Sequence, residues 1–154
     1  MSGGPIEDLE AAVRGLRAVI LAGENYRQVI ARATGLGVTE TQAISYLAVH
    51  GDRGQNDLAA DLGLTSGAAT ALIDRLERQG VAERYPHPHD RRRALVRLTD
   101  AGNGVVAISR DWLAAAFGSF PADQLPNLAD GLQRIAADLR TASEEAAIQD
   151  LTHG

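Results

Sequence analysis

The sequence predicts a mainly α-helical fold with a small β-hairpin, and three observations lead to this fold class. Aromatic residues make up only 4% of the 154 residues, so we expect a core of Ala, Leu, Val and Ile, a composition that favours helices. Apolar residues recur at spacings of three and four along most of the chain, which is the period of an amphipathic helix. Between residues 81 and 99 this period gives way to two short strand patterns joined by a loop.

The N-terminal segment, residues 6–34, is expected to form one long helix. Its apolar residues are spaced by three and four, so they form a single stripe along one face. The stripe consists of Ile6, Leu9, Val13, Leu16 and Ile20. A second helix is expected to begin at Thr39, which fits a capping box with Gln42, and to end near His50 and Gly51.

Two short helices joined by a tight turn are predicted in GDRGQNDLAADLGLTSGAATALIDRLERQG. Asn56 is positioned to cap the first helix, and the turn at residues 62–64 ends it. Thr65 or Ser66 caps the second helix, which Gly80 closes. Such a pair of helices with a glycine-containing turn is a helix-turn-helix.

A strand, a loop and a second strand are predicted directly after these helices, in VAERYP, HPHDRR and RALVRLT. The second strand alternates between two faces, as a half-buried strand does. A hairpin that follows a helix-turn-helix forms a wing. Residues 38–99 are therefore expected to be a winged helix-turn-helix, with Arg91, Arg92 and Arg93 at the tip of the wing.

Two more helices are expected in residues 100–148. Thr99 is positioned to cap the first, Pro121 follows its end, and Asp123 starts the second. The apolar positions of the last helix follow an a/d pattern over three heptads. They are Leu125, Leu128, Leu132, Ile135, Leu139, Ala142 and Ala146. Such a seam can pack within one chain, but its regularity favours a partner helix, so residues 6–34 and 100–148 are expected to form the dimerisation region.

The charge of the chain is uneven. The formal net charge is −5, yet residues 53–97 contain eight Arg against six Asp or Glu, and the rest of the chain contains seven Arg against fourteen acidic residues. The middle segment is therefore basic in an otherwise acidic chain. A block of like charge is often a solvated surface. Here a turn precedes the three arginines and a strand follows them, which indicates a binding partner.

Several other classes of protein are not expected. The chain has no cysteine, which rules out disulfides and thiolate metal sites. No apolar run approaches the ~20 residues that span a bilayer, and the N-terminus MSGGPIEDLE does not have the pattern of a secretory signal. We therefore expect a cytoplasmic protein with no membrane contact. Since the sequence has no phosphate loop, nucleophile elbow or zinc-protease motif, we expect neither enzyme activity nor a cofactor.

The segments TALIDRLERQGVAER and DRRRALVRLTDAG resemble the recognition helix and wing of the MarR family of winged-helix transcription regulators. The resemblance covers about residues 6–148. It implies a winged helix-turn-helix flanked by N- and C-terminal dimerisation helices. It also implies a homodimeric, sequence-specific regulator that binds double-stranded DNA at a pseudo-palindromic operator. The simplest such regulator is a repressor that a small-molecule ligand releases. The alternative is a winged-helix module that binds another protein and does not bind DNA.

The resemblance assigns DNA contacts to the recognition helix. Thr65, Ser66 and Thr70 lie at its start, and Ser66 and Thr70 share one face that would enter the major groove. Their ordinary roles would be capping, for Thr65 or Ser66, and a backbone hydrogen bond, for Thr70. Arg75 would contact a phosphate. Polar or basic residues are frequent in the family at three further positions, which here are Gly67, Ala68 and Ala71.

The wing carries the remaining predicted DNA contacts. Arg92 aligns with the arginine of the family's Asp-x-Arg wing motif, which would enter the minor groove, and Asp90 would hold it by a charge-assisted hydrogen bond. Arg91 and Arg93 would reach the flanking phosphates. The ordinary interpretation is a solvated, charged hairpin.

Two further kinds of site have candidate residues. Many members of the family bind small anionic aromatic ligands, for which the candidate lining residues here are Arg17, Tyr46, His50 and Trp112. Each also has an ordinary interpretation as a flanking charge, a core aromatic or a helix end. His87, His89 and Asp90 have the chemistry of metal ligands, but Pro88 restricts the approach of the two imidazoles, so no metal site is predicted.

Overall fold

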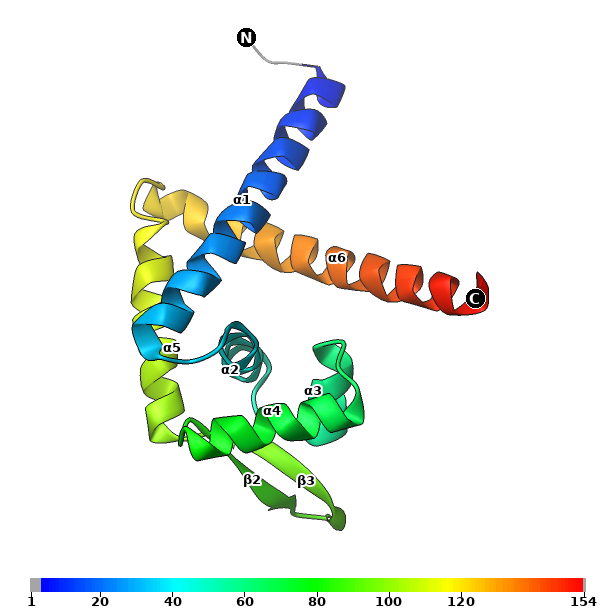
Figure 1. Cartoon of the computed structure of the whole chain (residues 1–154). Helices are drawn as coiled ribbons and strands as arrows, with labels where there is room; N and C mark the ends of the chain where they lie inside the picture. Colours follow the sequence, from blue (N-terminus) through cyan, green and yellow to red (C-terminus); the bar gives the residue numbers. More distant parts are fainter. Residues whose placement is uncertain (1–3, 154) are drawn as a thin grey trace. The chain divides into compact units, whose positions relative to one another are not determined.

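Six α-helices and a small three-stranded antiparallel sheet make up the described part of the chain in this computed structural model (Figure 1). The structure describes the backbone of residues 4–153 and the side chains of residues 4–149. The chain divides into two units, of which the first ends at Trp112 and the second begins at Leu113. The predicted fold class is confirmed.

The first unit begins with two helices, α1 (Pro5–Thr34) and α2 (Val38–His50). The bounds of α1 agree with the predicted segment, and Gly35 ends it in the left-handed conformation, with a φ of 71°. The predicted capping box at Thr39 is wrong. Gly37 takes the N-cap position in an extended conformation, so Thr39 already lies in the first turn of α2.

The helix-turn-helix consists of α3 (Gln55–Asp61) and α4 (Ser66–Arg78). Of the two candidate caps for α4, Thr65 is the N-cap, and its hydroxyl accepts a hydrogen bond from the Ala68 amide at 3.2 Å. Asn56, in contrast, does not cap α3. Gly54 occupies the N-cap position, because the chain is already held there by strand pairing, so Asn56 falls inside the first turn.

The sheet has the strand order β1-β3-β2, with β1 at Arg53–Gly54, β2 at Ala82–His87 and β3 at Asp90–Leu98. The sequence does not predict the short strand β1, because two residues carry no periodic pattern. The strand β3 begins at Asp90, so the three arginines belong to this strand and the turn itself consists of Pro88 and His89. The wing is therefore a hairpin with a third, two-residue strand at its edge.

One hydrophobic core joins α2, α3, α4 and the sheet. Its buried members are Leu36, Ala43, Ile44, Leu47, Leu58, Leu72, Ile73, Leu76, Val81, Ala82 and Val96. The helix α4 contributes one complete face to this core, on which Leu72, Ile73 and Leu76 are at most 1% exposed. Burial of each such side chain contributes about 1.5–3 kcal/mol, so the orientation of α4 about its axis is strongly determined.

The helix α5 (Asp100–Ala115) follows the wing. The predicted cap is confirmed, since the Thr99 hydroxyl accepts a hydrogen bond from the Gly102 amide at 3.2 Å. The same hydroxyl donates to the Gly80 carbonyl at 2.5 Å and so ties the start of α5 to the end of α4. The helix ends earlier than predicted, at Ala115, where the hydrogen bonds shorten to an i→i−3 pattern.

The second unit contains a 3₁₀ turn (Ala122–Gln124) and the helix α6 (Leu125–His153). Asp123 lies in the 3₁₀ turn, so the α-helix begins two residues later than predicted. Four of the predicted a/d residues of α6 are between 37% and 43% exposed. They are Leu125, Leu132, Ile135 and Leu139. Within the described residues, no helix is both long and apolar enough to cross a membrane.

The close approach of α5 to the α4–β2 turn generates a stability prediction. A Cβ at Gly102 would overlap the Val81 carbonyl oxygen. Gly102→Ala should therefore lower the free energy of unfolding by about 1–3 kcal/mol, measured by urea denaturation.

Gly104 offers a matched control, because it lies in the same helix and a Cβ there meets nothing within 4 Å. Gly104→Ala should raise the free energy of unfolding by about 0.5–1 kcal/mol. Equal effects of the two substitutions would contradict the proposed overlap.

Candidate nucleic-acid interface

The exposed face of α4 carries the hydroxyl groups predicted to contact DNA. Thr65, Ser66 and Thr70 are all exposed. Thr65 is the N-cap of α4, so the Ser66 hydroxyl does not cap the helix. The Thr70 hydroxyl donates to the Ser66 carbonyl at 2.9 Å, which is the backbone bond expected as its ordinary role. The structure thus brings the three residues together at the first turn and a half of an exposed helix face.

Arg84, a residue that sequence reasoning missed, links β2 to α4 and α3. Its Nη1 lies 2.8 Å from Asp74 Oδ1 and 2.6 Å from Glu77 Oε2, and its Nε donates to Gln55 Oε1 at 3.1 Å. Gln55 Nε2 in turn donates to Thr70 Oγ1 at 2.8 Å. No local pattern signals this network, because its members come from three elements. It holds the start of the wing against the predicted recognition helix.

Arg75 is engaged within the protein. Its Nε donates to Glu40 Oε1 at 2.5 Å, and the Glu40 side chain on α2 is only 8% exposed. A side chain at position 37 would overlap the Glu40 carboxylate, so Gly37 leaves the space that this carboxylate occupies. Asp74, on the same helix, pairs with Arg84 of β2. The ion pair with Glu40 holds α4 against α2.

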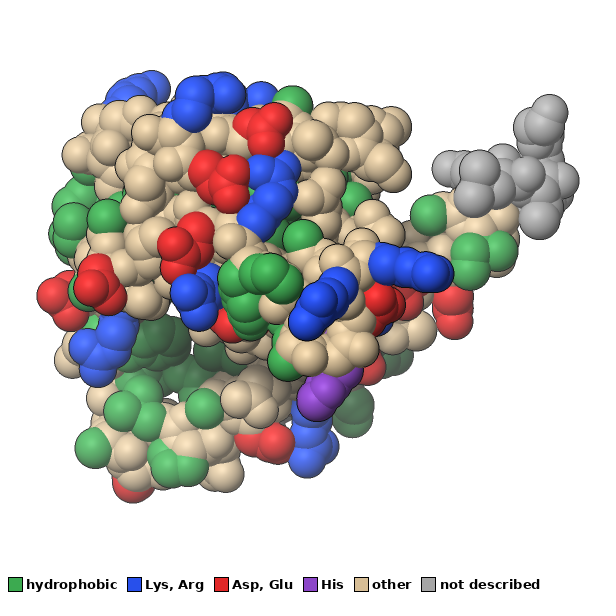
Figure 2. Space-filling model, turned by 90° about the horizontal axis from the view of Figure 1, so that it is seen from below, with side chains coloured by type: hydrophobic (Ala, Val, Ile, Leu, Met, Phe, Trp, Pro, Cys, Tyr) green, Lys and Arg blue, Asp and Glu red, His purple; other side chains and the backbone are tan. Residues whose placement is uncertain are grey.

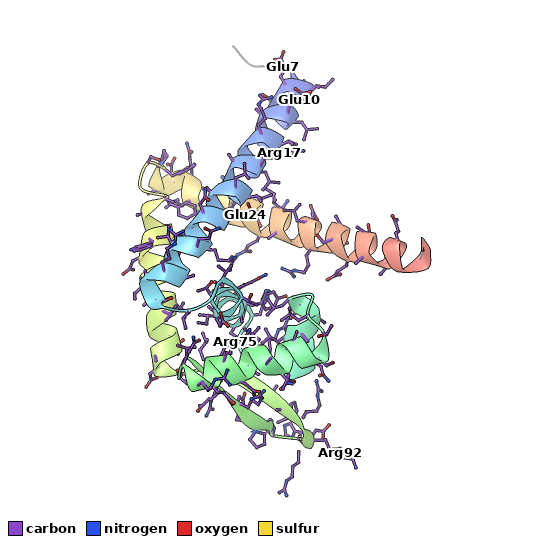
Figure 3. The ribbon with its side chains drawn as sticks, viewed as in Figure 1. Glu7, Glu10, Arg17, Glu24, Arg75 and Arg92 are labelled. Atoms are coloured by element: carbon purple, nitrogen blue, oxygen red, sulfur yellow. The ribbon has the colours of Figure 1, made fainter. Side chains whose placement is uncertain are left out.

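The three arginines of the wing form a bulge. Pro86 pairs with Ala94 and the next residue, His87, pairs with Asp90, so residues 91–93 have no partner on β2. Such an irregularity bends the strand and re-aims its side chains. Figure 3 shows Arg92 at the tip of the hairpin, and Figure 2, which views the same end of the molecule, shows basic side chains and a histidine there.

The arginines of the bulge differ in their partners. Asp90 Oδ1 accepts a hydrogen bond from the Arg92 backbone N–H at 3.0 Å. The expected bond from Asp90 to the Arg92 guanidinium group is therefore wrong, because Asp90 holds the backbone of Arg92 instead. Arg93 Nη2 lies 3.6 Å from Asp57 Oδ2 on α3. Within the described residues, the exposed side chains of Arg91 and Arg92 form no ion pair. These two cations are therefore available to a partner.

A second cluster stiffens the hairpin. The Tyr85 hydroxyl donates to Asp52 Oδ2 at 2.6 Å, and the Arg97 guanidinium lies 4.6 Å from the centre of the Tyr85 ring. The hydrogen bond to Asp52 raises the pKa of Tyr85. The hydrogen bond from Arg97 Nε to Glu83, at 2.8 Å, raises the pKa of Arg97. Arg97 therefore links β3 to β2 through its pair with Glu83.

The candidate ligand residues are only partly brought together. The rings of Tyr46 and His50 lie 4.4 Å apart on α2 and both are half-buried. Arg17 is exposed on α1, and Trp112 is 45% exposed on α5. A small cavity of about 30 Å³ is lined by Tyr26 and Ser109 among others, and none of the four candidate ligand residues lines it. A ligand site at these residues stays a prediction.

The wing histidines form a local turn. The His89 amide donates to His87 Nδ1 at 3.1 Å, which uses one imidazole nitrogen within the turn. In the part of the chain that the structure describes, no group of three His, Cys, Asp or Glu side chains is placed to hold a metal ion.

Comparisons with known proteins bear on this geometry. Residues 34–93 match the family model described as "MarR family". Two relatives from Bacillus subtilis are named as uncharacterized HTH-type transcriptional regulators. YcgE is 37% identical over 71 residues, 46% of each chain, and YkoM is 36% identical over 69 residues, 45% of each chain. The chain thus spans about half the length of the curated relatives it matches. These relatives are named as regulators and not as enzymes.

Solved structures show the same fold. A mutant of MepR from a multidrug-resistant S. aureus clinical isolate has a TM-score of 0.68 at 19% identity, covering 83% of this chain and 96% of its own. The S. aureus MepR–DNA complex has a TM-score of 0.56 at 21% identity, covering 80% of this chain and 97% of its own. The family model confirms the predicted resemblance over residues 34–93, and the solved structures confirm the fold.

The Arg75–Glu40 pair predicts a structural cost that is separate from DNA binding. Arg75→Ala leaves a buried carboxylate without its partner and should lower the free energy of unfolding by about 1–3 kcal/mol, measured by urea denaturation in the absence of DNA. Arg78→Ala, an exposed position on the same helix, should change it by less than about 0.5 kcal/mol. If the two variants were equally stable, the pair would not hold α4 in place.

Proposed function

We propose that this chain, whose residues 34–93 match the MarR family model, is a homodimeric, sequence-specific DNA-binding transcription regulator. One observation carries the proposal: the exposed hydroxyl face of α4 and the unpaired Arg91 and Arg92 belong to a single winged helix-turn-helix built on one core. A helix in the major groove and a wing in the adjacent minor groove require this combination.

On α4, the proposed contacts come from the first turn and a half. Ser66 and Thr70 face the base edges, and Thr65 caps the helix beside the phosphates. Arg75 acts mainly through Glu40, because its Nε is already bonded there, while its guanidinium, in a side chain 43% exposed, faces the phosphate backbone. S. aureus MepR has been solved in complex with DNA, which supports this docking by analogy.

On the wing, Arg92 enters the minor groove and Arg91 and Arg93 reach the flanking phosphates. Asp90 has a positioning role, since its bond to the Arg92 amide shapes the bulge. A polar depression of about 230 Å³ between the start of α3 and the bulge is lined in part by Gln55, Arg92 and Arg93. Because the segments outside residues 53–97 are acidic, DNA approaches most favourably at the wing.

A second copy of this chain is the proposed occupant of the uncovered apolar faces. Ile6 and Leu9 on α1 are 76% and 65% exposed, and the a/d seam of α6 is also uncovered. Apolar stripes of this length on helices of a soluble protein mark an interaction surface. A two-fold dimer presents two recognition helices, so its operator is pseudo-palindromic, with half-sites about one turn, ~10 bp, apart.

The regulatory response follows the simplest scheme. The dimer acts as a repressor in the cytoplasm, and a small anionic aromatic ligand shifts it toward a conformation with lower operator affinity. Arg17 would supply the cation for such a ligand, and Tyr46, His50 and Trp112 the aromatic contacts. The ring contact between Tyr46 and His50, which are tilted by 36° to one another, is the part of this set that supports the proposal.

The wing contact is tested by Arg92→Ala. Loss of one unpaired cation from the minor groove should weaken binding to the selected operator by about 1–3 kcal/mol. It should also reduce the dependence of log K on log salt concentration, measured by fluorescence anisotropy at several salt concentrations. Arg110→Ala is the control, since Arg110 is exposed on α5 and pairs with its neighbour Asp111.

Two outcomes would contradict the wing contact. Equal affinities of the Arg92 and Arg110 variants would remove Arg92 from the interface. If the folded protein bound no DNA even at low salt, the winged helix would have to serve a protein partner.

The dimer is tested on α6 with Ile135→Glu. Ile135 is 41% exposed, so a charge there is tolerated in one copy but is buried in the proposed dimer. Loss of the two isoleucines should weaken dimerisation by about 3–6 kcal/mol. Sedimentation equilibrium should then give the single-chain mass of 16.3 kDa in place of twice that mass. Gln133→Glu, an exposed polar position on the same helix, should remain dimeric. A dimeric Ile135 variant would place the interface elsewhere.

A further inference from the structure

We propose that a hydrogen-bond relay from Arg84 through Gln55 holds the Thr70 hydroxyl as an acceptor, so that α4 selects a base with an exocyclic amine, adenine or cytosine. The inference rests on the proposed DNA-binding function and names one determinant of its sequence specificity. It concerns one base position in each half of the operator.

The polarity of the relay is set at Arg84. The guanidinium is held by Asp74 and Glu77 at 2.8 Å and 2.6 Å, and its Nη2 lies 3.3 Å from the Thr70 carbonyl. Its Nε points at the side chain of Gln55, at 3.1 Å. A guanidinium nitrogen donates hydrogen bonds and does not accept them. Gln55 must therefore present its carbonyl oxygen to Arg84.

The orientation of Gln55 decides the role of Thr70. With its oxygen on Arg84, the amide turns its nitrogen to Thr70 and donates to Oγ1 at 2.8 Å. The Thr70 hydroxyl accepts this bond and gives its own hydrogen to the Ser66 carbonyl, 2.9 Å away. A hydroxyl has one hydrogen and two lone pairs. The hydrogen and one lone pair are thus in use, and the remaining lone pair can only accept.

An acceptor on α4 distinguishes two classes of base. In the major groove, adenine and cytosine each present an amine donor, whereas guanine and thymine present carbonyl oxygens at the corresponding edge. A lone pair on Thr70 is attracted to the first class and repelled by the second. The neighbouring Gly67, Ala68 and Ala71 offer no polar side chain, so this hydroxyl has a large share in the readout.

The first experiment compares full-length wild type, Thr70→Val and Thr70→Ser. Each protein selects sites from a random duplex pool. We expect one position per half-site at which wild type and Thr70→Ser select adenine or cytosine and Thr70→Val selects no base. Replacing the selected base by an analogue that lacks only the amino group should weaken wild-type binding roughly 3- to 10-fold. The same replacement should leave the affinity of Thr70→Val unchanged.

The second experiment tests the relay itself. Gln55→Leu removes both hydrogen bonds of the amide, so the Thr70 hydroxyl is free to rotate and the preference for an amine should fall. Arg97→Gln is the control, because Arg97 pairs with Glu83 on the hairpin and lies outside the relay. It should keep the full preference. Thermal unfolding shows that each variant is folded before its selectivity is measured.

Three results would overturn the relay. They are a Thr70-dependent preference for guanine or thymine, an amine preference that survives in Thr70→Val, and one that survives undiminished in Gln55→Leu. In each case the protein still binds DNA, so the proposed function stands. Absence of any DNA binding by folded wild type would instead refute the proposed function and the relay with it.

Discussion

The burial of one face of α4 is the constraint on which the rest of the site depends. Leu72, Ile73 and Leu76 lie in the core shared with α2, α3 and the sheet, so the helix cannot turn about its axis without exposing them. Their burial leaves Ser66 and Thr70 on the free face. The same core includes Val81 and Val96, so the wing is attached to the helix it accompanies. A rigid pairing of α4 and the wing follows from packing alone.

The arginines of residues 53–97 divide into those that build the site and those that are free to bind. Arg75, Arg84 and Arg97 each hold an acidic partner at 2.8 Å or less, and they connect α4 to α2, β2 to α4, and β3 to β2. Arg91 and Arg92, at the bulge, stay exposed. Surface ion pairs contribute little stability singly. Their main effect here is to position the elements that they connect. The unpaired arginines beside them remain free to bind a partner.

Under the proposed function, the uncovered apolar stripes and the polar surface of α4 and the wing have complementary roles. Exposed leucine and isoleucine side chains on α1 and α6 are unfavourable in an isolated chain. A symmetric dimer would cover them and would also set the distance between two recognition helices. Under this proposal the apolar stripes determine the spacing of the operator halves, and the hydroxyls and arginines determine what each half reads. The spacing of the two operator halves and the recognition of bases within each half then depend on different parts of the sequence.

The sequence by itself determined the helix bounds to within a few residues, the cap at Thr99, the hairpin, and the presence of exposed arginines, because each of these depends on local pattern or local hydrogen bonding. It narrowed the cap of α4 to Thr65 or Ser66, and the structure decided for Thr65. Only the tertiary structure decided the two-residue strand β1, the bulge that contains the arginines, and the partners of Arg75 and Arg84. Glu40 lies 35 residues from Arg75 in the chain, and Gln55, Thr70 and Arg84 come from three different elements. Such contacts have no period and no spacing rule. They form where packing brings side-chain donors and acceptors from distant segments together. This packing decides which arginines are paired within the protein and which stay exposed.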